Sequence, residues 1–234
     1  ARRSEKARQS FFANMSHDMR TPLNAIIGLS ELADKNLGDP QRVHQYLEKI
    51  NFSSRQLLGL INDILDMSRM EHGGVVLNET SFDLRTFMRE STEAFRIQAD
   101  AEHKDFALEM NIRNAQIVAD PFRVGQIFNN LLSNAFKFTS EGDKIRLSVE
   151  QLGAVEGEYE KFKFIVSDTG IGMSNEFLPH LFEPYSREMR FSEKQIAGTG
   201  LGMPIIRSLV AQMNGEIQVE SELGKGSVFT VVLP

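Results

Sequence analysis

Apolar side chains recur at helical intervals over the first third of the chain. With about 100° of rotation per residue, one apolar stripe gathers on a first helix that ends near Asn36. The members of this stripe are Phe12, Met15, Met19, Leu23 and Ile26. In the next segment, Gly38 suits a left-handed C-terminal cap and Asp39-Pro40 suit the start of another helix. The pattern therefore predicts a helix, a tight turn and a second helix.

The second helix carries a regular apolar seam. Its members are Val43, Leu47, Ile50, Leu57, Ile61 and Ile64. Because two helices alone bury too little apolar surface, this coiled-coil-like seam predicts that the hairpin forms a homodimer built as a four-helix bundle. The alternative is a hairpin that packs on the C-terminal part of its own chain. Gly73-Gly74 ends the helix and is a natural hinge, so we expect two domains, residues 1–73 and 74–234.

Beyond the glycine pair the pattern becomes a mixture of helices and strands. Asp83 and Asp120-Pro121 each precede an amphipathic stretch, and a third helical stretch runs from about Pro204 to Met213. Alternating apolar positions predict strands at 106–110, 116–119, 145–149, 162–166, 216–221 and 227–233. Short connecting turns favour a mixed, mostly antiparallel sheet layered with helices. The predicted fold class is α+β, a helical hairpin followed by an α/β sandwich.

Composition narrows the class of protein. The formal net charge is −6 and no basic run offsets it, which argues against nucleic acid as a partner. The absence of cysteine excludes disulfides and thiolate metal sites and fits a reducing compartment. No apolar run approaches the roughly 20 residues of a membrane span. The charged residues 1–10 are typical of the tail of an incoming helix, so we expect the cytoplasmic part of a longer protein, with any membrane anchor in upstream segments.

His17 lies opposite the apolar stripe of the first helix, and Asp18 follows it directly. Neutral imidazole is a nitrogen nucleophile near neutral pH, so an exposed helical histidine beside an acid can accept a phosphoryl group. A surface histidine taken alone is ordinarily only solvated. The motifs further along the chain decide between these interpretations.

Three polar residues share one arc of the helix that follows Pro121. Asn130, Asn134 and Lys137 lie opposite its apolar face. Amide oxygens suit Mg²⁺, and an ammonium group suits phosphate. The alternative interpretation of these three residues alone is a solvated polar stripe.

Glycine-rich segments follow this helix. Asp168-Thr169-Gly170-Ile171-Gly172 ends a strand and offers a carboxylate with close backbone approach to a ring. Gly198-Thr199-Gly200-Leu201-Gly202 precedes a helix N-terminus, an arrangement that favours phosphate binding. Gly224-Lys225-Gly226-Ser227 is explained by a bulged hairpin.

In order and spacing, these segments closely resemble the H, N, G1, F and G2 boxes of sensor histidine kinases. The matching segments are His17 to Pro22, Asn130 to Thr139, Asp168 to Gly172, Leu181 to Tyr185 and Gly198 to Gly202. The resemblance extends from about Phe11 to Leu233. It implies a transmitter core, in which a phosphoacceptor hairpin precedes an ATP-binding domain of the type shared with gyrase. The residues of the first box resemble those found in hybrid kinases.

The resemblance implies a role for each matched residue. His17 would accept the phosphoryl group, and Asp18, where the family more often has Glu, would polarise its imidazole. Asn130 and Asn134 would hold Mg²⁺, Lys137 would contact a phosphate, and Asp168 would accept a hydrogen bond from the adenine amine. The other residues that would bind ATP are Phe138, Gly170, Gly172, Arg187, Gly198, Thr199, Gly200, Leu201 and Gly202.

The implied activity is transfer of the γ-phosphoryl group of Mg-ATP to His17 and then to an aspartate of a response-regulator receiver domain. In gyrase-type ATPases a Glu that activates water stands at the position of Asn130, and an amide cannot act as that base. Thr21 would orient water for dephosphorylation of a docked receiver, or would only precede Pro22 at a helix bend. A nucleotide-binding scaffold and a chaperone-type ATPase are the competing functions.

Overall fold

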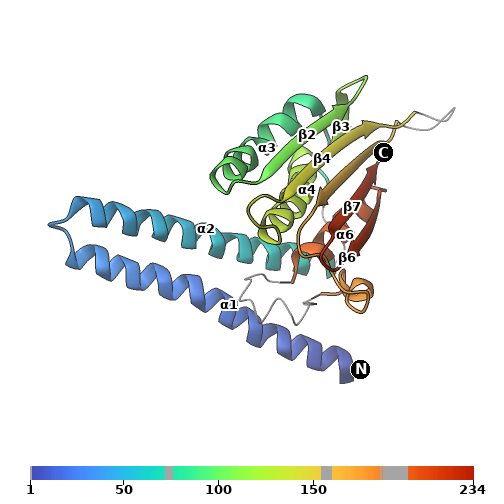
Figure 1. The fold of residues 1–234 in the computed structure, drawn as a ribbon. Coiled ribbons are helices and arrows are strands. Elements are labelled where there is room, and N and C mark those ends of the chain that lie inside the picture. Colours follow the sequence, from blue (N-terminus) through green and yellow to red (C-terminus); the bar gives the residue numbers. More distant parts are fainter. Residues whose placement is uncertain (1, 72–75, 154–159, 185, 187–199) are drawn as a thin grey trace. The chain divides into compact units, whose positions relative to one another are not determined.

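The computed structural model describes residues 2–71, 76–153, 160–184, 186 and 200–234 (Figure 1). The side chains of residues 2–14, 17 and 69–71 lie outside the described set. The chain divides into two compact units, the helical hairpin and a second unit that holds almost all of residues 73–234. The hinge predicted at Gly73-Gly74 lies outside the described residues.

The hairpin consists of α1 (Arg2–Lys35) and α2 (Pro40–Glu71). Asp39 begins α2 as predicted, because its Oδ1 accepts a hydrogen bond from Arg42 N at 3.2 Å. Pro22 lies inside α1, which continues through it. No helix in the described part of the chain is long and apolar enough to cross a membrane.

The predicted seam of α2 is only partly covered within one hairpin. Leu57 and Ile61 are half-buried, whereas Leu47, Leu58 and Leu65 are 48%, 59% and 48% exposed. Steps of eleven and seven residues keep these three leucines on one side of the helix. The exposed leucine row of α2 therefore shares only Leu47 with the seam that the sequence predicts.

The second unit is built on a five-stranded sheet with the order β2-β4-β5-β7-β6. Its strands are β2 (Asp105–Asn111), β4 (Lys144–Gln151), β5 (Phe162–Asp168), β6 (Glu216–Glu222) and β7 (Gly226–Leu233). β2 pairs parallel with β4, and every other pair is antiparallel. These pairings confirm the predicted mixed, mostly antiparallel sheet.

The helices α3 (Leu84–Ala101), α4 (Pro121–Lys137) and α6 (Gly202–Gln212) cover the sheet (Figure 1). Alternate residues of the central strands are buried, as in Ile145, Leu147 and Val149 of β4, so the sheet turns one apolar face toward the helices. The rings of Phe128 on α4 and Phe164 on β5 are 4.5 Å apart at their centroids. This core fixes α4 against β5.

Both N-caps predicted in the second unit are present. Asp83 Oδ1 accepts from Thr86 N at 2.7 Å, and Asp120 Oδ1 accepts from Arg123 N at 3.1 Å. Asp120 Oδ2 also accepts from Asn78 N at 2.8 Å, which ties the segment before the sheet to the start of α4.

Three elements differ from the sequence-based prediction. A strand β1 (Thr80–Asp83) pairs with β3 (Gln116–Ala119), and a single turn of 3-10 helix, η1, spans Leu178–His180. Only Phe82 of β1 is half-buried, so the alternation that predicts strands is absent there. α6 begins at Gly202, which makes Pro204 its third residue.

Candidate nucleotide and phosphotransfer site

The polar face of α4 meets the start of α6. Asn130, Asn134 and Lys137 are all half-buried and occupy successive turns of α4. Asn134 Nδ2 donates to Met203 Sδ at 3.5 Å, and Asn130 Oδ1 lies 3.5 Å from the place that a Cβ on Gly202 would take. Asn130 and Asn134 therefore lie beside the end of the second glycine-rich segment.

The segment from Asp168 to Gly172 is locked against the end of α4. Asp168 Oδ1 accepts from Gly170 N at 2.9 Å, and Ile171 N donates to Phe138 O at 3.1 Å. A Cβ on Gly170 would overlap the carbonyl oxygen of Phe138, and one on Gly172 would overlap that of Glu222. Only glycine allows this close backbone approach. The last turn of α4 and the Asp168 strand end consequently form one rigid corner.

Asp168 has a perturbed ionisation. Burial raises the pKa of its carboxyl from 3.8 to about 6, backbone hydrogen bonds from Gly170 and Ser227 oppose that rise, and the Asp143 carboxylate adds to it. A partly desolvated carboxyl group at a strand end can accept a hydrogen bond from a polar ligand.

The ionisation of Asp168 predicts a stability effect. The difference between 3.8 and about 6 corresponds to about 3 kcal/mol of destabilisation at pH values well above 6. We expect Asp168→Asn to raise the melting temperature of the nucleotide-free chain at pH 7.5, because the amide keeps an acceptor for Gly170 N without a charge.

The sign of the pH dependence is fixed by the raised pKa. The stabilising effect of protonating Asp168 is complete below about pH 4 and is lost as pH rises through about 6. The difference in melting temperature between Asp168→Asn and the unchanged chain should therefore shrink as pH falls from 7.5 to 4.5. Asp100→Asn, an exposed carboxylate on α3, is the matched control and should show no such trend. A difference independent of pH would contradict the assignment.

The β6–β7 turn supports this corner, a role that the sequence analysis missed. Gly226 has φ of +97°, and a Cβ there would overlap the carbonyl oxygen of Asp168. Ser221 Oγ accepts from Met173 N at 2.9 Å and donates to Gly226 O at 2.8 Å. A bulged hairpin alone would not need these contacts. In the sequence, the repeated glycines of Gly224-Lys225-Gly226 were the feature that could have indicated this supporting role.

The second glycine-rich segment is described only at its end. Gly200 has φ of +70°, Leu201 is buried and Gly202 opens α6. Arg187, Gly198 and Thr199 lie outside the described residues.

The hairpin carries the predicted phosphoacceptor sequence on α1. His17 belongs to this helix, but its side chain lies outside the described set. Asp18 is half-buried, and Thr21 is exposed one helical turn after His17.

Two sequence-family matches decide the family. Residues 7–73 match the "His Kinase A (phospho-acceptor) domain" family. Residues 119–234 match the "Histidine kinase-, DNA gyrase B-, and HSP90-like ATPase" family. The chain belongs to the sensor histidine kinases. The second match also assigns ATP binding to the second domain of this histidine kinase.

Named relatives agree with the family. Sensor histidine kinase GacS of Pseudomonas protegens is 38% identical over 98% of this chain and 25% of its own length. The autoinducer 2 sensor kinase/phosphatase LuxQ of Vibrio parahaemolyticus is 34% identical over the whole chain and 27% of its own length. The histidine kinase chain thus spans about a quarter of these relatives.

Solved structures share the fold of this histidine kinase. Full-length ShkA in complex with AMPPNP has a TM-score of 0.68 at 28% identity, covering 95% of this chain and 45% of that one. Histidine kinase ThkA in complex with response regulator TrrA has a TM-score of 0.63 at 26% identity, covering 99% of this chain and 64% of that one. Together with the observed elements, they confirm the predicted α+β fold class.

Proposed function

We propose that this chain transfers the γ-phosphoryl group of Mg-ATP to His17 and passes it to an aspartate of a response-regulator receiver domain. The observation that carries the proposal is the rigid corner formed by α4, the Asp168 strand end and the start of α6. Asp168 at the end of β5 and the residues Asn130, Asn134 and Lys137 of α4 lie on adjoining elements, which supports the proposal. The ShkA complex with AMPPNP and the ThkA complex with a response regulator support the two halves of the reaction.

The donor chemistry of α4 fits a magnesium ion. No group of three or more His, Cys, Asp or Glu residues among those described could hold a metal. Asn134 turns its Nδ2 toward Met203, so its Oδ1 is the atom left for a metal, and Asn130 Oδ1 faces the small Gly202. Two amide oxygens suit Mg²⁺ when phosphate oxygens complete its shell. When bound, the ion would neutralise charge on the phosphoryl group.

Each of the candidate residues would have its own role in the reaction. Asp168 would accept a hydrogen bond from the adenine amine, and Lys137 would bind a phosphate oxygen. Neutral His17 would attack the phosphorus in line, with its ring oriented by Asp18. Asn130 is an amide and cannot remove a proton from water, so hydrolysis would lack its base. Because His17 and the proposed nucleotide residues Lys137 and Asp168 belong to different units, the transfer would take place between the two units.

Incubation with γ-labelled Mg-ATP separates this proposal from its rivals. A kinase retains an acid-labile phosphate on the protein, an ATPase releases free phosphate, and a nucleotide-binding scaffold does neither. We expect retained label with little free phosphate. Free phosphate without retained label would overturn the proposal.

We further propose that the hairpin forms a homodimer. The support is the exposed row of Leu47, Leu58 and Leu65 on α2, with Leu23 and Ile27 exposed at 46% and 49% on α1. Exposed leucines that share one side of a long helix are typical of a bundle interface.

Charges in this row should dissociate the dimer. We expect the double variant Leu58→Glu/Leu65→Glu to be monomeric by light scattering, because each buried glutamate would cost several kcal/mol without a partner. Phe52→Glu is the control, since Phe52 is 64% exposed but lies about 140° around the helix from Leu47. A dimeric double variant would show that the row is not the interface.

Thr21 carries a second proposed activity, dephosphorylation of the receiver. Thr21 is an exposed residue of α1 one turn after His17, and a hydroxyl group at this place could orient a water molecule. The relative LuxQ is described as a sensor kinase/phosphatase.

Thr21→Ala should separate the two activities. We expect the variant to label His17 normally but to dephosphorylate a phosphorylated receiver at least about tenfold more slowly, since only the water-orienting hydroxyl is lost. Thr21→Ser should retain the rate. Equal loss of both activities, or of neither, would leave Thr21 a structural residue beside Pro22.

A further inference from the structure

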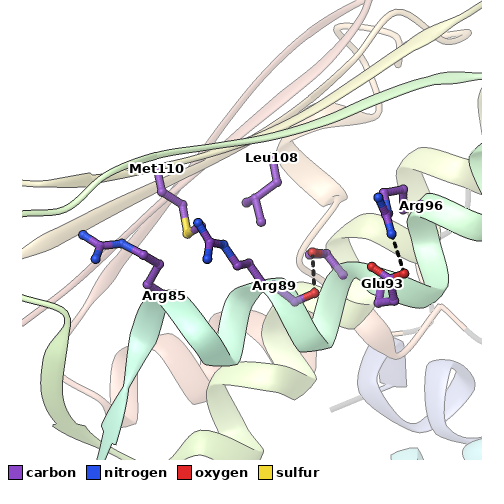
Figure 2. A pocket seen from close by; sticks show the side chains of 7 residues that line it. Arg85, Arg89, Glu93, Arg96, Leu108 and Met110 are labelled. Atoms are coloured by element: carbon purple, nitrogen blue, oxygen red, sulfur yellow. Dashed lines mark hydrogen bonds and ion pairs between the residues drawn. The ribbon is translucent and has the colours of Figure 1, made fainter.

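A basic groove lies between α3 and the edge strand β2. Its volume is about 460 Å³, and Figure 2 shows the side chains that line it. α3 contributes Arg85, Arg89, Thr92, Glu93 and Arg96, and β2 contributes Leu108 and Met110. The groove thus combines a cationic wall with an apolar floor.

The groove is distinct from the nucleotide site. β2 is the first strand in the sheet order, two strands away from β5, which carries Asp168. The nucleotide-binding residues come from α4, the end of β5 and the start of α6, none of which lines the groove. The groove and the proposed nucleotide site therefore share no residue.

Arg85 and Arg89, two of the three arginines of the groove, form no ion pair with the described residues. Arg85 Nη2 donates to Ile112 O at 2.7 Å, which orients the guanidinium without cancelling its charge. Arg96 pairs with Glu93 at 2.6 Å. The Arg89 side chain has no hydrogen bond or ion pair with any described residue. Two unpaired positive charges thus face a groove on a chain whose net charge is −6.

The spacing of the arginines fits an extended ligand better than a compact anion. At about 1.5 Å per residue, Arg85 and Arg89 are about 6 Å apart along α3, and Arg96 lies about 10 Å further on. The backbone positions of the three arginines are thus spread over about 16 Å of helix, which is longer than one phosphate or carboxylate. Side chains on one face of an extended peptide are about 7 Å apart, so acidic residues four positions apart would span the row.

The backbone of β2 is available on one side. β2 pairs only with β4, and no backbone hydrogen bond from another described segment reaches residues 106–111. A sheet edge of this kind is the usual place where an extended peptide adds a strand. Leu108 and Met110, both half-buried, lie on the face of β2 that meets the arginines.

We propose that this groove binds an acidic extended segment of a partner protein by strand addition to β2. Two carboxylates of the segment, four residues apart, contact the Arg85/Arg89 pair and Arg96. The residue between them on the same face is apolar and contacts Leu108 and Met110. Residues on the other face meet Asp105 and Glu109, both exposed, and are uncharged or basic.

A labelled peptide with the core Glu-Thr-Leu-Thr-Glu is the probe, and binding is measured by fluorescence anisotropy. We expect Arg89→Glu to weaken binding at least about tenfold, because one favourable charge contact becomes repulsive. Arg89 is exposed, so the variant should fold normally. Arg42→Glu, an equal charge change on the exposed surface of the hairpin, should change affinity by less than about twofold.

N-methylated peptides test strand addition itself. Methylation at odd or at even positions blocks the amides of only one edge. We expect one of the two peptides to lose at least about tenfold in affinity and the other to bind nearly as well as the parent, because only one edge pairs with β2. Equal effects of both, no binding of the parent, or competition by octanoate or inorganic phosphate at the peptide's own concentration would overturn the proposal.

Discussion

Asn134→Ala should lose nearly all autophosphorylation while the protein remains folded. In the proposed site the Asn134 amide holds the magnesium ion that orients the phosphoryl group, and loss of such a contact lowers rates by about 100- to 1,000-fold. The folded state should lose less than about 1 kcal/mol, because among the described residues this side chain makes one hydrogen bond, a weak one to Met203 Sδ.

The measurement is labelling of the chain together with ATP affinity with and without Mg²⁺. The variant should bind Mg-ATP more weakly yet bind metal-free ATP almost unchanged, since the base contacts at Asp168 persist. Ser133→Ala is the matched control, because Ser133 is exposed on the same helix beside Asn134. Unchanged ATP affinity and activity in Asn134→Ala would remove the metal assignment.

Gly170→Ala should abolish ATP binding and destabilise the second domain. The added Cβ would overlap the carbonyl oxygen of Phe138, and backbone on both sides is fixed by the hydrogen bond from Ile171 N to that same oxygen. A clash with backbone cannot be relieved by a rotamer change, so we expect a loss of about 2–4 kcal/mol in the free energy of unfolding.

Gly153→Ala is the control for this substitution, because a Cβ there would meet no atom of the described residues within 4 Å. Chemical denaturation and ATP binding should both be unchanged in that variant to within about 0.5 kcal/mol. If Gly170→Ala bound ATP normally, the corner between α4 and Asp168 would not form the base pocket.

Most of the fold followed from local signals. Asp39, Asp83 and Asp120 each start a helix as predicted, because a capping carboxylate acts within its own turn. The alternation of Ile145, Leu147 and Val149 predicted β4, since that strand has one face on the core. Such elements depend on neighbours within a few residues.

Features that depend on distant residues were missed. β1 forms because Thr80 to Asp83 find β3 about 36 residues away, and its own sequence lacks alternation. Gly226 looked like an ordinary turn residue, because its contact with Asp168 exists only once β5 and β7 pair. The candidate nucleotide residues could be chosen from motif order, but the approach of Gly170 to Phe138 and of Asn134 to Met203 depends on tertiary structure.

Mapping of the phosphorylated residue tests the central proposal most directly. After incubation with γ-labelled Mg-ATP, the label should be acid-labile and alkali-stable and should lie on the proteolytic fragment that contains His17. His17→Gln should bind ATP with unchanged affinity and retain no label. Label on another residue, or label retained by His17→Gln, would contradict the account.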